Sequence, residues 1–88
     1  MHNYKIVQGV VKDKPTRLAK QNATIFGVRD RGLSYSVIAY NKLGESAIKY
    51  LKKDTRILLS GNRLAKGLIN CREINVIQAW HKLIYMIY

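Results

Sequence analysis

The residue types that usually catalyse reactions or bind metals are few in this chain and far apart in its sequence. Cys71 is the single cysteine, and both histidines, His2 and His81, lie near the chain ends, so no basic partner is expected beside the thiol. The five acids are scattered, at Asp13, Asp30, Glu45, Asp54 and Glu73. Because no cluster has metal-ligand or catalytic spacing, we expect no enzyme, no metal and no cofactor.

Positive charge is the property that indicates a partner. The 88 residues include 16 Lys and Arg against 5 Asp and Glu, which gives a formal net charge of +11. This charge repels itself in a compact fold unless a polyanion is near, so nucleic acid is the leading partner and an anionic membrane surface the competitor. No apolar run approaches the roughly 18 residues that span a bilayer. With no signal peptide and one cysteine, we expect a cytoplasmic protein, or one of an organelle or nucleoid.

The elements that must position these cations begin with three strands. Residues Tyr4–Val11 are β-branched and roughly alternating, and Gly9 indicates a bulge or bend. A basic loop is predicted over residues 12–22. Strands follow over Ala23–Arg29 and Leu33–Tyr40, and the tight turn between them predicts a hairpin.

One short basic helix is predicted after the third strand. Asn41 is the expected N-cap, and Asp54 and Thr55 should end the helix. Its apolar stripe comprises Leu43, Ala47, Ile48 and Leu51. Its C-terminal lysines, where the helix dipole favours cations, are Lys49, Lys52 and Lys53.

Two further strands complete the pattern, over residues 55–65 and 68–80, with a turn at Lys66 and Gly67. Three strands, a helix and two strands are the element order of the OB-fold, a Greek-key barrel whose strand 2–3 face and loops bind oligonucleotides or oligosaccharides. We therefore predict an all-β protein, a single five-stranded OB-fold domain over residues 1–88, with one short helix between strands 3 and 4.

Residues 37–65, VIAYNKLGESAIKYLKKDTRILLSGNRLA, resemble bacterial-type single-stranded DNA-binding proteins. The opening YKIVQGVVKDKP is similar to that family's first strand, and the likeness extends over most of residues 4–79. The resemblance rests on the order of the elements and on the spacing of six residues, Tyr40, Lys42, Leu43, Tyr50, Leu51 and Gly61. The resemblance implies a sequence-tolerant single-stranded DNA-binding protein of DNA replication, recombination or repair, whose subunits pair as dimers or tetramers.

Three departures from the family qualify this interpretation. The chain has no acidic tip after Glu73, so recruitment of other enzymes through such a tip is not expected. Ser34 stands where the family has a stacking tryptophan, and the two hairpin loops are short. The PriB type of primosomal single-strand binder also lacks the acidic tail, and it remains an alternative relative.

Aromatic residues are the candidates for base stacking. Tyr40 aligns with the family's stacking aromatic at the end of strand 3, and an ordinary barrel residue is the alternative. Tyr35 has the opposite parity, which indicates the core or a subunit interface. Phe26 is assigned to the core because it alternates with Thr24 and Val28. The pattern of residues 23–29 does not indicate which face of this strand lines the nucleic-acid groove. Trp80 could stack, but cover of an apolar edge or interface is the favoured role.

Cations on the loops and later strands are the candidates for phosphate contacts. A solvated basic surface explains any one of them, and only their number indicates nucleic acid. The helix lysines are weaker candidates, because the helix end explains them. The predicted contacts are Lys12, Lys14, Arg17 and Lys20 in the first loop, Arg29 and Arg31 at the hairpin, and Arg56, Arg63, Lys66 and Arg72 on the last two strands.

Two other functions fit the same charge. A small OB-fold RNA-binding protein, associated with the ribosome or with tRNA, is the first, since charge does not choose between DNA and RNA. The second is docking to a protein partner through the C-terminal segment LIYMIY, residues 83–88, in which case the positive charge is incidental. The apolar residues 83–88 also predict a homo-oligomer, a dimer or tetramer, because soluble monomers rarely leave such a patch in water.

Overall fold

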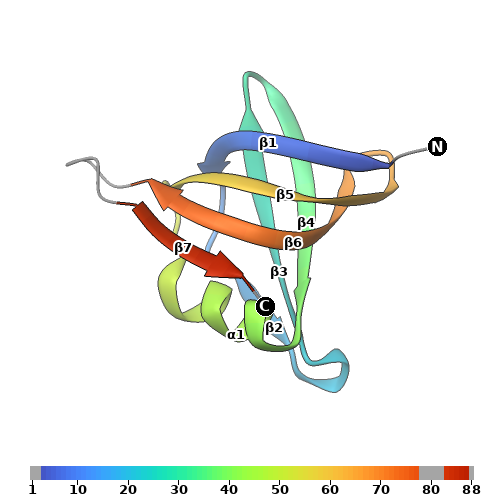
Figure 1. Ribbon diagram of the computed structural model, residues 1–88, viewed down its shortest axis with the longest axis vertical. Helices are drawn as coiled ribbons and strands as arrows, with labels where there is room; N and C mark the ends of the chain where they lie inside the picture. Colours follow the sequence, from blue (N-terminus) through green and yellow to red (C-terminus); the bar gives the residue numbers. More distant parts are fainter. Residues whose placement is uncertain (1–2, 78–82, 88) are drawn as a thin grey trace.

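Five strands close into a barrel in the computed structural model, which describes residues 3–77 and 83–87 (Figure 1). Around the ring they are β1 (Tyr4–Val11), β5 (Arg56–Ala65), β6 (Leu68–Ile77), β4 (Leu33–Tyr40) and β3 (Ala23–Asp30). Pairing of β3 with β1 closes the ring, and β4 and β6 are its one parallel pair. Helix α1 (Asn41–Tyr50) connects β4 to β5. The predicted all-β, OB-like barrel, with a helix between its third and fourth strands, is confirmed.

Alternation along each strand separates an apolar interior from a more polar exterior. On β3 the side chains of Thr24, Phe26 and Val28 are buried, which identifies the inward face of this strand and confirms Phe26 as a core residue. The largest fully buried apolar side chains come from all five barrel strands. They are Val7, Val11, Val28, Val37, Ile57, Leu59, Ile69 and Ile74. Burial of each contributes about 1.5–3 kcal/mol relative to exposure.

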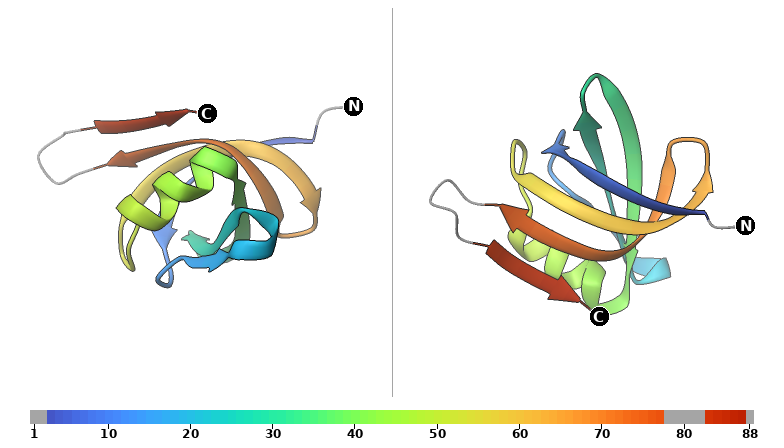
Figure 2. Two further views of the ribbon diagram at one scale, coloured as in Figure 1. Left: turned by 90° about the horizontal axis from the view of Figure 1, so that it is seen from below. Right: turned by 45° about the horizontal axis from the view of Figure 1, so that its top comes forward.

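Helix α1 covers one end of the barrel (Figure 2, left). Leu43 and Ala47, together with Leu51 just beyond the helix, belong to the same buried cluster as the strand residues. The predicted stripe was wrong in one member, because the Ile48 side chain is 38% exposed. The helix ends at Tyr50, with Leu51 in extended conformation, so it is shorter than the sequence pattern indicated.

The start of α1 also differs from the prediction. Tyr40, in extended conformation, occupies the N-cap position, and no side chain caps the helix, so the assignment of Asn41 as N-cap was wrong. Asn41 has a φ of 55°, a left-handed conformation that asparagine adopts more readily than most residues. Its backbone N–H donates to the carbonyl of Asn22 at 2.7 Å. A contact with a distant loop therefore fixes the turn, in place of a local cap.

The first loop is more regular than the sequence indicated. It contains a short strand, β2 (Thr16–Leu18), and one turn of 3-10 helix, η1 (Ala19–Gln21). Strand β2 extends the edge of β3, with Thr16 opposite Ile25. A strand of three residues is too short to show an alternation of apolar and polar side chains, so the sequence pattern could not predict it. Its position depends on pairing with β3.

A further strand, β7 (Leu83–Ile87), pairs antiparallel with the second half of β6, from Glu73 opposite Ile87 to Ile77 opposite Leu83. The sequence did not predict this pairing. Residues 78–82, including Trp80, lie outside the described residues. Self-association through the C-terminal segment stays a prediction. In the part of the chain that the structure describes, no helix is long and apolar enough to cross a membrane.

Gly9 is the residue that lets β1 approach β3. A Cβ at this position would lie 2.5 Å from the backbone oxygen of Arg29. We expect Gly9→Ala to destabilise the fold by about 1–3 kcal/mol, because backbone atoms would have to move. Urea unfolding of purified protein would measure this change.

Gly27→Ala is the matched control. The nearest atom to a Cβ there is Cδ of the Lys12 side chain, at 3.4 Å, which can move. We expect a change below about 1 kcal/mol for this variant. Equal unfolding midpoints for Gly9→Ala and the unchanged protein would contradict the assigned role of Gly9.

Candidate nucleic-acid interface

The outward face of β3 and β4 is a shallow surface with small residues at its centre. Gly27 lies opposite Ser36, and Ile25 lies opposite Ile38, so a small pair adjoins an apolar pair. A hollow of about 300 Å³ opens over this face, lined by β3, β4 and the first loop, which contributes Lys12. A stacked base requires a flat, partly apolar surface, and its phosphate requires a cation nearby.

Lys12 reaches across this face. Its aliphatic stem lies beside Gly27, and its Nζ donates to Ser34 Oγ at 3.2 Å. Ser34 is the position where the resembling family has a stacking tryptophan. In this chain the Lys12 ammonium therefore lies where a tryptophan ring would lie in that family. This favours contact with a phosphate over base stacking at this point.

The same face continues onto β6. The parallel pairing places Asn70 opposite Ile38, so outward residues of β4 and β6 lie side by side. The β5–β6 register shifts where Ser60 pairs with Glu73 and Gly61 pairs with Cys71, which leaves Arg72 in a bulge. Bulges re-aim side chains and commonly occur near functional sites. The Arg72 side chain is exposed at the edge of this face.

Tyr40 lies beside Arg72 at the end of the face. Both residues line a hollow of about 470 Å³, together with Lys42 and Asn70. The Tyr40 side chain is 40% exposed, so the expectation that it lies on the outside of the barrel is met. An exposed ring next to two cations is suited to stacking on a base while the cations hold the adjoining phosphate. Its stacking on a base stays a prediction.

Tyr35 lies on the other side of the same strand. It packs against the core, and the Lys5 ammonium lies 5.6 Å from its ring centroid. These contacts agree with the core role, and a place in a subunit interface stays a prediction. Tyr35 therefore packs at the margin of the core, and it also lines the hollow on β3 and β4.

The ten predicted cations fall into several groups. Lys12 and Lys14 line the hollow on β3 and β4, and Arg72 lines the hollow beside Tyr40. Another hollow, on the β1–β5 side, gathers Arg29, Arg31 and Arg56. Lys20, Arg63 and Lys66 are exposed but line none of these three hollows.

Arg17 forms hydrogen bonds within the chain that connect parts of the fold. Its guanidinium is half-buried and donates to Thr24 Oγ1 at 3.1 Å and to Asn22 Oδ1. The Thr24 hydroxyl in turn donates to the carbonyl of Gly44 in α1 at 2.6 Å. Arg17 therefore links the first loop, β3 and the helix. Its predicted phosphate contact stays a prediction, but several of its donors already have partners.

Cys71 is buried beneath the β6 part of the face. Its side chain is 4% exposed and its thiol donates to the carbonyl of Glu73 at 3.4 Å. Burial raises the pKa of this thiol from 9.0 to about 12. A thiol that keeps its proton is a poor nucleophile. Within residues 3–77 and 83–87, no group of His, Cys, Asp or Glu side chains could hold a metal ion.

Sequence reasoning missed two residues that line the hollow at the interface. Lys42 and Asn70 line the hollow beside Tyr40, although neither was predicted. The alternation of β4 and β6 could have identified outward positions such as Asn70. Which outward positions meet, however, depends on the parallel pairing of two strands that are distant in sequence.

Comparisons with solved structures show what the barrel resembles. No protein-family model and no curated protein matches the chain. Apo TiaS, a tRNA agmatidine synthetase, matches with 18% identity and a TM-score of 0.71 over 85% of this chain and 18% of that one. A TiaS complex with tRNA, AMPCPP and agmatine matches with 18% identity and a TM-score of 0.71, over 85% and 19%. A ZRD-deleted TiaS mutant with agmatine matches with 18% identity and a TM-score of 0.74, over 97% and 25%.

The likeness is one of fold. At 18% identity, and spanning at most 25% of these proteins, the chain shares their barrel and nothing more is shown by the match. The barrel is compatible with nucleic-acid binding. These matches do not show membership of the single-stranded DNA-binding family, which was predicted from residues 37–65.

The buried thiol generates a prediction on pH. Because its pKa is raised in the folded protein, the unfolded chain loses the proton first, and folding stability falls as pH rises from 9.0 toward about 12. Between about pH 8 and about pH 10, this group should cost about 1.4 kcal/mol of stability. Urea unfolding at both pH values would measure it.

Cys71→Ala is the control for this measurement, because its cavity cost does not depend on pH. Its stability should fall less than that of the unchanged protein over the same interval. Parallel losses in the two proteins would contradict the assignment of a proton held by burial.

Proposed function

We propose that this protein binds single-stranded nucleic acid with little sequence preference, and that single-stranded DNA in replication, recombination or repair is its ligand. The observation that supports the proposal most is the exposed Tyr40 ring beside Arg72, at one end of a continuous face on β3, β4 and β6. Lys12 and Lys14 lie along the same face. This arrangement supplies a stacking platform and a path of cations for one strand.

The proposed mode of binding follows from the groups on the face. Cations contact the phosphates, which every sequence has, and a tyrosine ring stacks on any base. The lining residues of the two interface hollows include four cations, Lys12, Lys14, Lys42 and Arg72, against two amide side chains, Asn41 and Asn70. We therefore assign affinity to phosphates and stacking, with no reaction catalysed and no cofactor required. The sequence resemblance supports a relationship to bacterial-type single-stranded DNA-binding proteins, with the PriB type as an alternative, and supports a cytoplasmic or nucleoid location.

RNA is the second candidate ligand. It is favoured by the likeness of the barrel to TiaS, one of whose structures contains tRNA. The same face would then bind an unpaired segment of a folded RNA, whose bases are free to stack. The two candidates share one interface and differ in the strand that occupies it.

Competition distinguishes these candidates. Protein bound to a labelled oligothymidylate would be challenged with unlabelled poly(dT) and with a structured tRNA at equal nucleotide concentration. Preferential displacement by poly(dT) supports DNA, and preferential displacement by tRNA supports RNA. Failure of both to bind at moderate salt would refute the proposed function.

The dominance of phosphate contacts predicts a steep dependence on salt. The logarithm of the affinity for single strands should fall with the logarithm of salt concentration, at a slope of about −0.7 per phosphate neutralised. Mixed-sequence oligonucleotides of equal length should give the same slope, because no base is read. Fluorescence anisotropy at several salt concentrations would measure it. An affinity that stays constant as salt rises is the contrary result.

Tyr40→Ala tests the stacking platform. Loss of the ring should weaken single-strand binding by about 1–3 kcal/mol, while the fold persists because the side chain is on the outside. Tyr50→Ala is the matched control, since Tyr50 is 42% exposed against 40% for Tyr40 but lines a different hollow beside Lys49. Titration of one oligonucleotide with each variant would compare them. Equal weakening by both substitutions, or none by either, would contradict a stacking role for Tyr40.

A further inference from the structure

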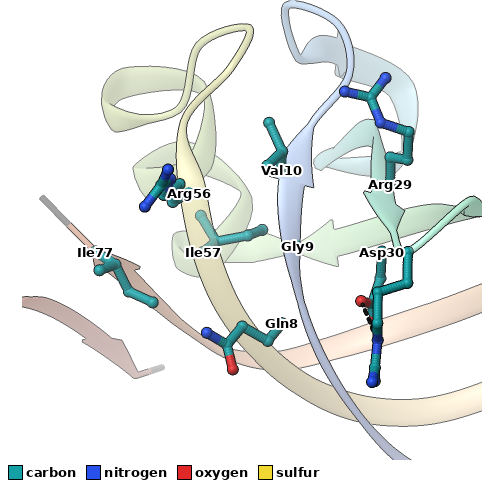
Figure 3. Close-up of a pocket in the computed structure, with 9 residues that line it drawn as sticks. Gln8, Gly9, Val10, Arg29, Asp30, Arg56, Ile57 and Ile77 are labelled. Atoms are coloured by element: carbon teal, nitrogen blue, oxygen red, sulfur yellow. Dashed lines mark hydrogen bonds and ion pairs between the residues drawn. The ribbon is translucent and has the colours of Figure 1, made fainter.

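Three arginines from different parts of the chain line one hollow of about 580 Å³ on the β1–β5 side of the barrel. Arg29 comes from the end of β3, Arg31 from the turn after it, and Arg56 from the start of β5. Figure 3 shows the Arg29 and Arg56 side chains on opposite sides of β1, with Gly9 and Val10 between them. This hollow is separate from the two that line the candidate interface.

The backbone explains why two of these arginines lie near each other. Val10 is paired on one edge with Arg29 of β3 and on the other with Arg56 of β5. Directly opposed residues in a ladder point to the same side of the sheet. Since neighbouring strands are about 4.8 Å apart, the two arginines begin roughly 10 Å from each other on one surface. The barrel closure at Val10 therefore creates the pair.

The charge of the hollow is strongly positive. Asp30 is its one carboxylate among the lining residues, and it already pairs with Arg31, at 3.2 Å. Three arginines less one aspartate leave a charge of +2. The remaining wall includes apolar side chains of Val10, Ile57 and Ile77, and Gln8 adds a neutral hydrogen-bonding group. A net positive charge on one hollow favours the binding of an anion there.

The hollow connects with the candidate interface through Ser34. Arg29 is paired with Ser34 across the β3–β4 ladder, and the Ser34 hydroxyl accepts the hydrogen bond from Lys12. Lys12 lines the interface hollow, and Arg29 lines the arginine hollow. A path of cations thus runs from the face on β3 and β4 around the end of β3 to Arg56.

We propose that the arginine hollow is a second phosphate-binding site, which receives the backbone of a nucleic-acid strand as it leaves the β3–β4 face. The inference rests on the proposed function, and it adds the route of the strand. Arginine suits this role, because its planar guanidinium binds two phosphate oxygens at once. A strand long enough to reach both sites would contact Tyr40 at one end and Arg56 at the other.

The test uses the double variant Arg29→Gln with Arg56→Gln. It compares oligothymidylates at the two ends of the range of site sizes for single OB domains, about 4 and about 16 nucleotides. We expect binding of the longer strand to weaken by about tenfold to hundredfold, because two charged hydrogen-bonding groups are lost. Its salt slope should become shallower by about 1.4. The shorter strand, held by the β3–β4 face, should change less than about threefold. Circular dichroism would verify that the variant folds, as both side chains are exposed.

Lys49→Gln with Lys52→Gln is the matched control. It removes the same charge, and neither lysine lines the arginine hollow or the interface hollows. At moderate salt it should change the affinity for either length less than about threefold, because distant exposed charges are screened. Equal weakening of both lengths by the arginine variant, or equal effects of the arginine and lysine variants, would overturn the proposal.

A second experiment tests the arginine hollow even if the proposed function is wrong. If the unchanged protein binds neither strand, that function fails, and the hollow is tested with tripolyphosphate, a free chain of phosphates. Arginine Nε–Hε resonances would be followed during the titration. Selective shifts at Arg29 and Arg56, with Arg63 unmoved, would support a phosphate site for a free ligand. Absence of selective shifts would overturn it.

Discussion

Closure of the barrel at Val10 is the constraint on which the rest of the structure depends. This residue pairs with β5 on one edge and with β3 on the other, and Gly9 beside it permits the approach. Without that closure β1 and the second half of β3 would be open edges, and the apolar side chains of five strands would lose their common interior. The outer surface depends on it too, because pairing with Val10 brings Arg29 and Arg56 together.

Charge is distributed on this barrel in a way that the fold alone does not require. The apolar interior and the covered barrel end do not need a charged exterior, yet the chain has 16 Lys and Arg residues against 5 Asp and Glu. Self-repulsion of such an exterior opposes compaction, and a small domain has little stability to spare. Arg17 shows one way in which a cation is accommodated, since its guanidinium bonds within the chain. Cations with no such internal role are most simply explained by an anionic partner.

Sequence patterns predicted the features that depend on local periodicity. The alternation of β1, β3 and β4 and the stripe of α1 each carry their own signal, so the barrel followed from element order. Strands β2 and β7 carried no such signal, because each depends on the neighbour that it pairs with. The start of α1 was missed because Asn41 is held by the backbone of Asn22, a residue of another loop. The meeting of Tyr40 with Arg72 depends on a parallel pairing and a bulge, which no local pattern encodes.

The small size of the domain limits what one face can bind, and this makes the connection between sites important. A short face with one exposed ring and a few cations offers modest affinity by itself. When a second group of cations lies along the same strand, the second contact becomes intramolecular and has a high effective concentration. Ser34 is where the two groups meet, since it contacts Lys12 and pairs with Arg29. A serine at this position leaves room for the backbone of a strand to pass, whereas a large ring would stand between the two groups of cations.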